Sequence, residues 1–227
     1  MNNIEVFLVV EGQTEQTFIR DILAPEIAQK GMYLHAALIG KPGHKGGDIR
    51  FERAKNDIGN FLTQRKDTFV SMMIDYFRVD ASWPGRDLIN NKTREGMKLS
   101  AIDKAKLIKE ETHKKIIAAF PDHNAETRFI PYIEMHEFEA LLFSDASILA
   151  KRIGVDVSLI QNIINECGSP EEINDNPDSA PSVRLNNLMN NYRKVAMGKS
   201  IAEAIGINKI RSQCPNFNEW LIQLENI

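Results

Sequence analysis

The sequence predicts an α/β protein with a doubly wound, mostly parallel four-stranded sheet, helices on both of its faces and a helical C-terminal portion. Apolar runs and amphipathic stretches alternate in the order β-α-β-α-β-α-β. The runs are almost continuously apolar, as in parallel strands covered on both faces. Beyond residue 144 only helical patterns remain. We therefore expect an α/β domain over 1–144 and a helical subdomain over 145–227 that packs on it.

The first strand and helix are predicted near the N-terminus. Residues 4–10 (IEVFLVV) are nearly all apolar, which is typical of a buried strand. Phe18 and Ile22 then recur at helical spacing behind a predicted N-cap at Thr14. Gly31 is expected to end this helix.

The second and third strands flank an amphipathic helix. Residues 32–40 (MYLHAALIG) form the second strand, which the glycine-rich loop GKPGHKGGD ends. Residues 49–65 carry apolar side chains at helical spacing, and residues 68–75 (TFVSMMID) form the third strand. This strand ends on an acid, Asp75.

A long connection separates the third strand from the rest of the predicted sheet. Residues 76–100 contain proline and glycine, and so long a connection in a compact domain is usually functional or mobile. We expect Trp83 to anchor it on the core. A lysine-rich helix over 101–119 and a fourth strand over 127–137 follow. The remaining helices are predicted at residues 145–153, 156–166, 182–195, 199–205 and 214–225.

The composition is that of a globular protein. Of the 227 residues 43% are hydrophobic and 26% are charged, and no apolar run is long enough to cross a bilayer, so we expect no membrane association. The N-terminus lacks the basic and small-residue features of a secretory signal. Cys167 and Cys214 have no metal-ligand spacing, which favours a reduced, cytoplasmic protein.

The charges are distributed unevenly around a net charge of −3. Residues 121–178 carry twelve acidic against three basic side chains, residues 182–211 six basic against one acidic, and residues 41–66 seven basic against three acidic. An acidic centre between basic segments suits a metal site that faces a phosphate backbone. A mixed, solvated surface explains the same pattern.

Acidic side chains follow three of the four predicted strands. Glu11 and Asp75 end the first and third strands, and Glu134, Glu137 and Glu139 lie at the end of the fourth. The carboxyl ends of parallel strands share one edge of a sheet, so these groups should converge if strands one and three are neighbours. Clustered carboxylates raise one another's pKa, and Mg²⁺ or Mn²⁺ relieves that conflict. The sequence thus predicts a metal site with Glu11, Asp75 and Glu137 or Glu139 as ligands.

Each acid also has an ordinary structural explanation. Glu11 suits the start of the following helix, where its charge meets the positive end of the dipole. Asp75 suits a turn, and Glu137 and Glu139 suit the start of the segment EFEALLF.

Several stretches resemble a bacterial family known as domain of unknown function 4276. They are VVEGQTEQTFI, MMIDYF with SWPG after it, FIPYIEMHEFEALLF, APSVRL and IGINKIRSQCPNFNEWLIQLE, and together they span nearly the whole chain. The resemblance implies a Toprim-like fold, related to topoisomerases, primases and overcoming-lysogenization-defect nucleases. It also implies an ABC-type ATPase encoded nearby, in a defence-associated locus.

The Toprim pattern has a Glu after strand one, which Glu11 matches, and an Asp-x-Asp pair after strand three, whose first Asp is matched by Asp75. The chain departs from the pattern at Phe77, which stands where the second Asp would be. Asp80 is the nearest replacement as a metal ligand. Both a rearranged site and a lost one stay open.

Two segments are candidates for phosphate or nucleic-acid binding. Ser182 and Arg184 lie at a predicted helix start, a place that favours anions, although Ser182 also suits simple N-capping. Lys41 and Lys45 lie in the glycine-rich loop, whose amides are able to contact phosphates. A plain flexible loop is the alternative.

Three functions compete. The first is a Mg²⁺- or Mn²⁺-dependent phosphoryl-transfer enzyme, a nuclease, with Glu11 and Asp75 as catalytic residues. The second is a non-catalytic partner or sensor subunit that docks on an ATPase, which the missing second Asp favours. The third is a protein that binds a small nucleotide at the same edge. The sequence leaves the substrate and the oligomeric state open.

Overall fold

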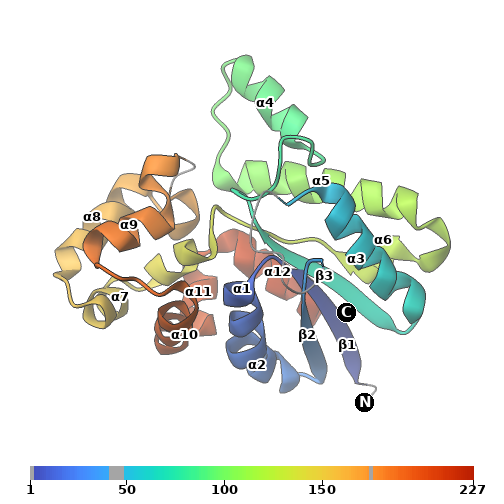
Figure 1. Cartoon of the computed structure of the whole chain (residues 1–227), viewed down its shortest axis with the longest axis horizontal. Coiled ribbons are helices and arrows are strands. Elements are labelled where there is room, and N and C mark those ends of the chain that lie inside the picture. The colour runs from blue at the N-terminus through green and yellow to red at the C-terminus, as the bar shows by residue number, and fades with distance from the viewer. Residues whose placement is uncertain (1–2, 41–48, 174–175) are drawn as a thin grey trace.

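The computed structural model describes residues 3–40, 49–173 and 176–227 of the chain. Lys41 and Lys45, the candidates in the glycine-rich loop, lie outside the described residues. Figure 1 shows the sheet on one side of the molecule and helices α7, α8 and α9 on the other, with α4 projecting from the top.

The sheet is parallel in every pairing between its strands and has the order β2-β1-β3-β4, with β5 also pairing with β3. The predicted α/β class and parallel sheet are therefore confirmed. The strands are β1 Ile4–Val10, β2 Met32–Leu38, β3 Thr68–Asp75, β4 Phe129–Ile130 and β5 Ile133–Glu134.

The fourth predicted strand is wrong as a single element. It forms two short strands, β4 and β5, which are separated at Pro131 and Tyr132. Proline lacks the N–H that a continuous ladder requires, so the chain leaves the sheet at Pro131 and rejoins it two residues later. The sheet consequently has five strands where four were predicted.

The described helices include those predicted, with shifted boundaries. They are α1 Gln13–Phe18, α2 Ala24–Ala28, α3 Phe51–Gln64, α4 Arg86–Arg94, α5 Ala101–Ala119, α6 Ala125–Arg128, α7 Ala146–Ile153, α8 Val157–Cys167, α9 Pro181–Leu188, α10 Lys194–Ile205, α11 Ile207–Gln213 and α12 Pro215–Glu225. A π-helical turn, Ile19–Leu23, joins α1 to α2.

Two of the boundary predictions need physical correction. Thr14 is not the N-cap of α1: Gly12 occupies that position, and no side chain caps the helix. The helix predicted at 182–195 ends already at Leu188, and the next begins at Lys194 rather than 199. By contrast, α5 has the predicted bounds, fixed by a capping box between Ser100 and Asp103.

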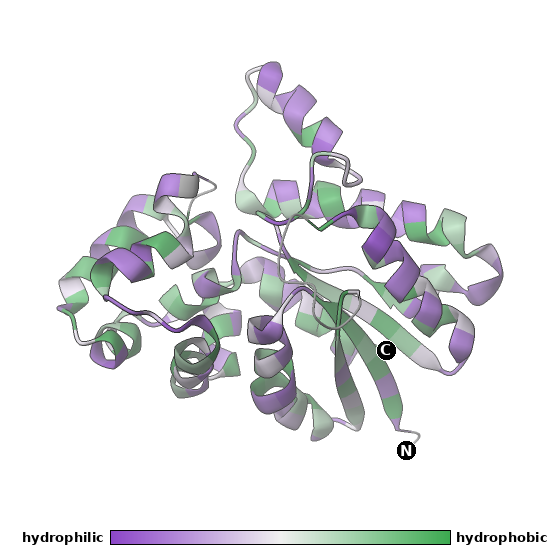
Figure 2. Ribbon diagram, in the orientation of Figure 1, coloured by the Kyte–Doolittle hydropathy of each residue, from purple (hydrophilic) through white to green (hydrophobic). Residues whose placement is uncertain are grey.

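The two faces of the sheet bury separate hydrophobic clusters. Leu8 and Val10 of β1 face α1, α2 and the C-terminal helices, whereas Val9 faces α3 and α5. On β3, Met73 belongs to the first of these clusters and Met72 to the second, because side chains alternate between the two faces along a strand. Figure 2 shows the strands mostly in green and the exposed helix α4 largely in purple. The C-terminal helices therefore share one hydrophobic core with the sheet.

Trp83 anchors the connection after β3, as predicted. Its side chain is buried, stacks edge-on against Phe51 and donates a hydrogen bond of 2.9 Å from Nε1 to the Thr112 hydroxyl. The connection also contains α4. The connection is thus attached to α3 and α5 through Trp83, and it forms a helix after this residue.

Replacing Trp83 by Phe should lower the free energy of unfolding by about 2 kcal/mol, because the smaller ring leaves space in the core and removes the bond to Thr112. Chemical denaturation measures this. Tyr33→Phe, which trims a 39% exposed ring, should change stability by less than about 0.5 kcal/mol. Equal losses in the two variants would show that Trp83 is not an anchor.

Candidate functional site

Acidic side chains meet at the carboxyl edge of the sheet. β1 and β3 are neighbours, and the strand order reverses between them because β2 follows β1 on one side and β3 lies on the other. Asp75 pairs in register with Glu134 of β5. The backbone N–H of Asp75 lies 3.4 Å from Glu11 Oε2 and donates to it. The predicted adjacency of the first and third strands is thus confirmed, and Glu11 meets Asp75 at this edge.

Glu15 joins this edge from the first turns of α1. Its side chain is buried, and a Cβ atom placed on Gly12 would lie only 3.0 Å from its Oε2 atom. A side chain at position 12 would therefore displace the carboxylate. Gly12 thereby lets the chain turn from β1 into α1 with Glu11 and Glu15 close together.

The segment after β5 brings two more carboxylates, and α10 brings a lysine that pairs with them. Glu139 lies in the 3₁₀ segment Phe138–Ser144 and is 1% exposed; its Oε2 atom lies 3.2 Å from Lys194 Nζ. Glu137 Oε1 lies 3.8 Å from the same ammonium group. The N–H of Phe138, between the two glutamates, donates a 3.1 Å hydrogen bond to Asp75 Oδ1. This bond ties the segment to the end of β3.

We call this group the acidic edge; its members are Glu11, Glu15, Asp75, Glu134, Glu137 and Glu139. Two buried carboxylate oxygens, Glu134 Oε1 and Glu139 Oε1, have no hydrogen-bond partner among the described residues. Glu134 Oε2 accepts a 2.6 Å bond from the Tyr132 hydroxyl.

Burial and the repulsion of neighbouring acids raise the pKa values of Glu11, Asp75 and Glu139. The pKa of Glu11 is raised to about 8, first by burial and then by the charge of Glu15, although Arg78 at 3.3 Å lowers it. Burial, with Glu11 and Glu15, raises the pKa of Asp75 well above its ordinary value. Burial likewise raises the pKa of Glu139, against the influence of Lys194. The strand-end Glu11 therefore contacts Arg78 and the Asp75 amide, and its raised pKa favours the protonated form at neutral pH.

This arrangement predicts a pH-dependent stability. Because the folded pKa of Glu11 is about 8 and its ordinary value is 4.5, the folded protein keeps a proton that the unfolded chain loses in that window. The free energy of unfolding should fall as pH rises from about 4.5 to 8. At pH 9 without divalent cations, Glu11→Gln should be about 2 kcal/mol more stable than wild type, and the difference should vanish near pH 4. The exposed Glu26→Gln serves as the control in denaturation curves. A Glu11→Gln variant that is less stable at every pH would contradict this prediction.

Of the other predicted residues, Asp80 and Arg184 have their own local partners, and Ser182 contacts the acidic edge through its backbone. Asp80 closes a turn, accepting hydrogen bonds from the backbone and hydroxyl of Ser82. The N–H of Ser182, near the start of α9, donates to Glu137 Oε2 at 3.0 Å. The Glu137 carboxylate thus occupies the helix start at which a phosphate was predicted to bind. Arg184 donates to the Ser179 carbonyl at 2.9 Å and lies 3.8 Å from Glu166. Arg184 thus holds α9 to the end of α8.

Sequence reasoning did not single out Lys194, Arg78 or Glu15 as site residues. Lys194 belongs to the basic segment 182–211, and Arg78 follows Asp75 by three residues, but their partners become visible only in three dimensions. Lys194 begins α10, where a positive charge opposes the helix dipole. Its pairing with Glu137 and Glu139 explains this unfavourable position.

Among the described residues, no group of three or more His, Cys, Asp or Glu side chains is arranged to hold a metal ion. The carboxylates of the acidic edge instead suit a Mg²⁺ or Mn²⁺ site that has few protein ligands. Magnesium sites often use one or two protein carboxylates and complete their shell with water and substrate phosphates. Glu11 and Asp75 supply such a pair at the carboxyl ends of neighbouring strands, where the Glu11 carboxylate contacts the Asp75 backbone N–H. These residues therefore fit a divalent cation held by two carboxylates.

Within the described part of the chain, no helix combines the length and apolar character needed to cross a membrane. A family model described as domain of unknown function (DUF4276) matches residues 10–225. Searches of curated proteins and of solved structures returned no match.

Proposed function

The chain belongs to the family described as domain of unknown function DUF4276, and we propose that it is a Toprim-like phosphoryl-transfer enzyme that uses Mg²⁺ or Mn²⁺ and acts as a nuclease. One observation carries the proposal. Glu11 and Asp75 touch at the switch point of a parallel sheet, among further buried acids whose pKa values are raised. Ligand sites of open α/β sheets lie at this position, and perturbed pKa values cluster at functional sites.

Glu11 and Asp75 would hold the cation, which when bound would polarise a phosphodiester and neutralise developing charge. Glu11 would bind the cation in its deprotonated form, so the cation would compete with the proton that a pKa of about 8 keeps on the metal-free side chain at neutral pH. Asp75 is oriented by the Phe138 amide. Lys194, whose side chain is 42% exposed, supplies positive charge at the rim for a phosphate oxygen.

Binding to nucleic acid as a function of salt tests this proposal. If the protein contacts a phosphate backbone, the logarithm of the binding constant should fall linearly with the logarithm of salt concentration, by about 0.7–0.9 per phosphate contact. Lys194→Gln should reduce that slope by about one contact, whereas Lys209→Gln, an exposed lysine on α11, serves as the matched control. A slope near zero in the wild type would remove the nuclease proposal.

A second candidate is a non-catalytic Toprim-like partner or sensor that docks on an ABC-type ATPase. The specific observation in its favour is that no three-ligand group exists among the described residues, with Phe77 in place of a second Asp. In this case purified protein should neither cleave nucleic acid nor bind Mn²⁺, with or without an ATPase present.

A further inference from the structure

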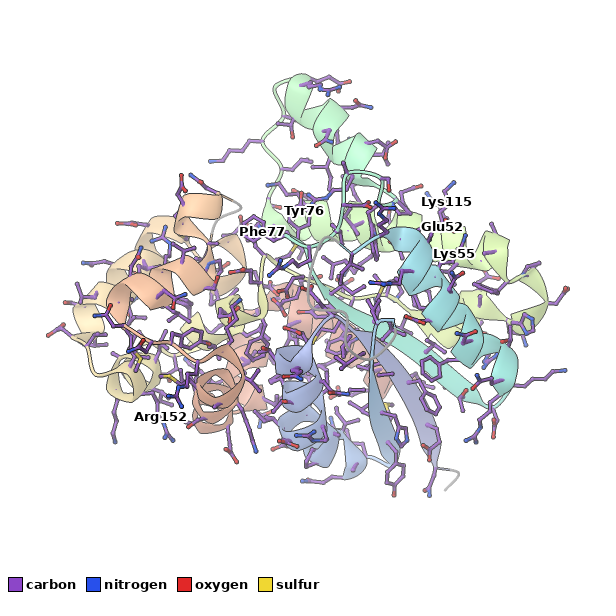
Figure 3. The ribbon with its side chains drawn as sticks, in the orientation of Figure 1. Glu52, Lys55, Tyr76, Phe77, Lys115 and Arg152 are labelled. Carbon is purple, nitrogen blue, oxygen red and sulfur yellow. The ribbon has the colours of Figure 1, made fainter. Side chains whose placement is uncertain are left out.

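A cavity of about 800 Å³ lies beside the acidic edge and has no role in the function proposed so far. It is lined by α4 and the residues after it, by the start of α5 and by the end of α8. Its volume lies in the range of small-molecule sites. We call it the α4 cavity. Figure 3 shows two of its lining residues, Tyr76 and Phe77, near the centre of the molecule, between the helices α4 and α5 and the C-terminal helices.

The aromatic wall of the α4 cavity is built on the segments that form the acidic edge. Tyr76 and Phe77 directly follow Asp75, and His136 lies between Glu134 and Glu137. The two segments are hydrogen-bonded to each other: the Tyr76 N–H donates to the Glu134 carbonyl at 2.8 Å and the Phe77 N–H to the His136 carbonyl at 3.2 Å. A ligand that reaches from the acidic edge into the cavity would thus contact the same two hydrogen-bonded segments along its length.

Phe77 is the ring in this wall that offers open surface. The guanidinium of Arg86 lies 3.9 Å from the centre of the Tyr76 ring and covers it, and Tyr76 and His136 are themselves buried. Phe77 is only half-buried, and its ring centre lies 5.7 Å from that of His136 in a tilted arrangement. Part of the Phe77 side chain is therefore accessible where it lines the cavity.

The polar lining of the cavity suits a nucleotide better than a purely apolar ligand. Asn90, exposed on α4, offers an amide for base-edge hydrogen bonds. Lys98 and Lys104 also line the cavity and carry positive charge, which favours phosphates. The opposite wall contains Glu166, whose side chain lies beside Arg184.

We infer that the α4 cavity binds an unpaired nucleobase next to the phosphate at the acidic edge, with Phe77 as its stacking surface. This inference rests on the proposed nuclease function and adds the substrate class: a single-stranded nucleic acid, because a paired base cannot leave its stack without cost. Phe77, in the place of the second Asp of the Toprim pattern, then contacts substrate where the pattern has a metal ligand.

Fluorescence anisotropy with two labelled DNA probes of equal charge tests this inference. One is a twelve-residue oligothymidylate and the other its abasic analogue, both titrated with and without Mg²⁺. Wild type should bind the thymidylate at least about fivefold more tightly, since stacking of one base on an aromatic ring is worth that much or more. Phe77→Leu should remove this preference. Tyr33→Leu, which removes an exposed ring on β2, should keep it.

Phe77→Trp keeps an aromatic ring and supplies a second readout if the leucine variant folds poorly. It should retain the preference, and its fluorescence should be quenched by the thymidylate and not by the abasic probe. Equal affinity for the two probes in the wild type, without quenching in Phe77→Trp, would overturn the base-binding inference and leave the nuclease proposal standing. Absence of binding to either probe would overturn both.

Discussion

Asp75→Asn and Glu11→Gln should each lower the rate of phosphodiester hydrolysis by about 10²–10⁴-fold. Asp75 would lose the charge that holds a divalent cation, although its amide oxygen still accepts from the Phe138 N–H. Glu11 would lose the carboxylate that, once deprotonated, holds the same cation. Both substitutions preserve size, so the buried packing should survive. Initial rates on single-stranded DNA and RNA with Mg²⁺ or Mn²⁺ measure the effect.

Asp122→Asn, an exposed acid before α6, is the matched control and should keep the wild-type rate. The pH–rate profile adds a readout that a folding defect would not give. At subsaturating Mg²⁺ the wild-type rate should rise as pH approaches 8, because the cation competes with the proton on Glu11, and Glu11→Gln should lack this rise. Equal rates in the wild type and both variants would show either that the reaction takes place at another site or that the protein does not catalyse it.

Lys194→Met should lower the free energy of unfolding by about 3 kcal/mol at pH 8. The substitution leaves Glu139, which is 1% exposed, beside Glu137 without the ammonium group that lies between them. Removing one partner of a buried ion pair typically costs about 3–5 kcal/mol. The lower end applies because the Lys194 side chain is 42% exposed and water screens it.

The loss should shrink as the pH falls, because Glu139, whose pKa is already raised, then takes up a proton. The double variant Lys194→Met with Glu139→Gln should recover most of the stability at pH 8, because no unpaired charge remains at position 139. Lys209→Met, on the exposed side of α11, should change stability by less than about 0.5 kcal/mol. A Lys194→Met loss that is independent of pH and not rescued would show that packing, not charge, explains it.

The meeting of Glu11 and Asp75 could be predicted from sequence because it depends on strand order alone. Once β1 and β3 are neighbours in a parallel sheet, Glu11 and Asp75 must share an edge, and the apolar runs before them identify the strands. Lys194 and Arg78 could not be paired with these acids in the same way. Their positions depend on how α10 packs on the segment after β5 and on a turn after β3, which no periodicity encodes.

The predicted boundaries of α10 were wrong because a tertiary contact determines where this helix lies. Gly198 lies inside α10, although glycine disfavours helices. A Cβ atom there would lie 3.0 Å from the Phe138 ring, so glycine allows α10 to approach the 138–144 segment closely. This approach brings Lys194 to Glu139. Gly198, which lies in the gap between the predicted helices 182–195 and 199–205, is thus part of what brings Lys194 to Glu139.

Calorimetric titration of Mn²⁺ at pH 7 tests the central claim, that the acidic edge binds a divalent cation through Glu11 and Asp75. Because the pKa of Glu11 is about 8, the metal-free protein carries a proton there, and binding should release about one proton. Titrations in two buffers with different heats of ionisation measure that release. Wild type should bind Mn²⁺ with proton release, and Glu11→Gln should bind at least about tenfold more weakly and without it. Absence of Mn²⁺ binding by the wild type, or equal binding and proton release in both proteins, would contradict the claim.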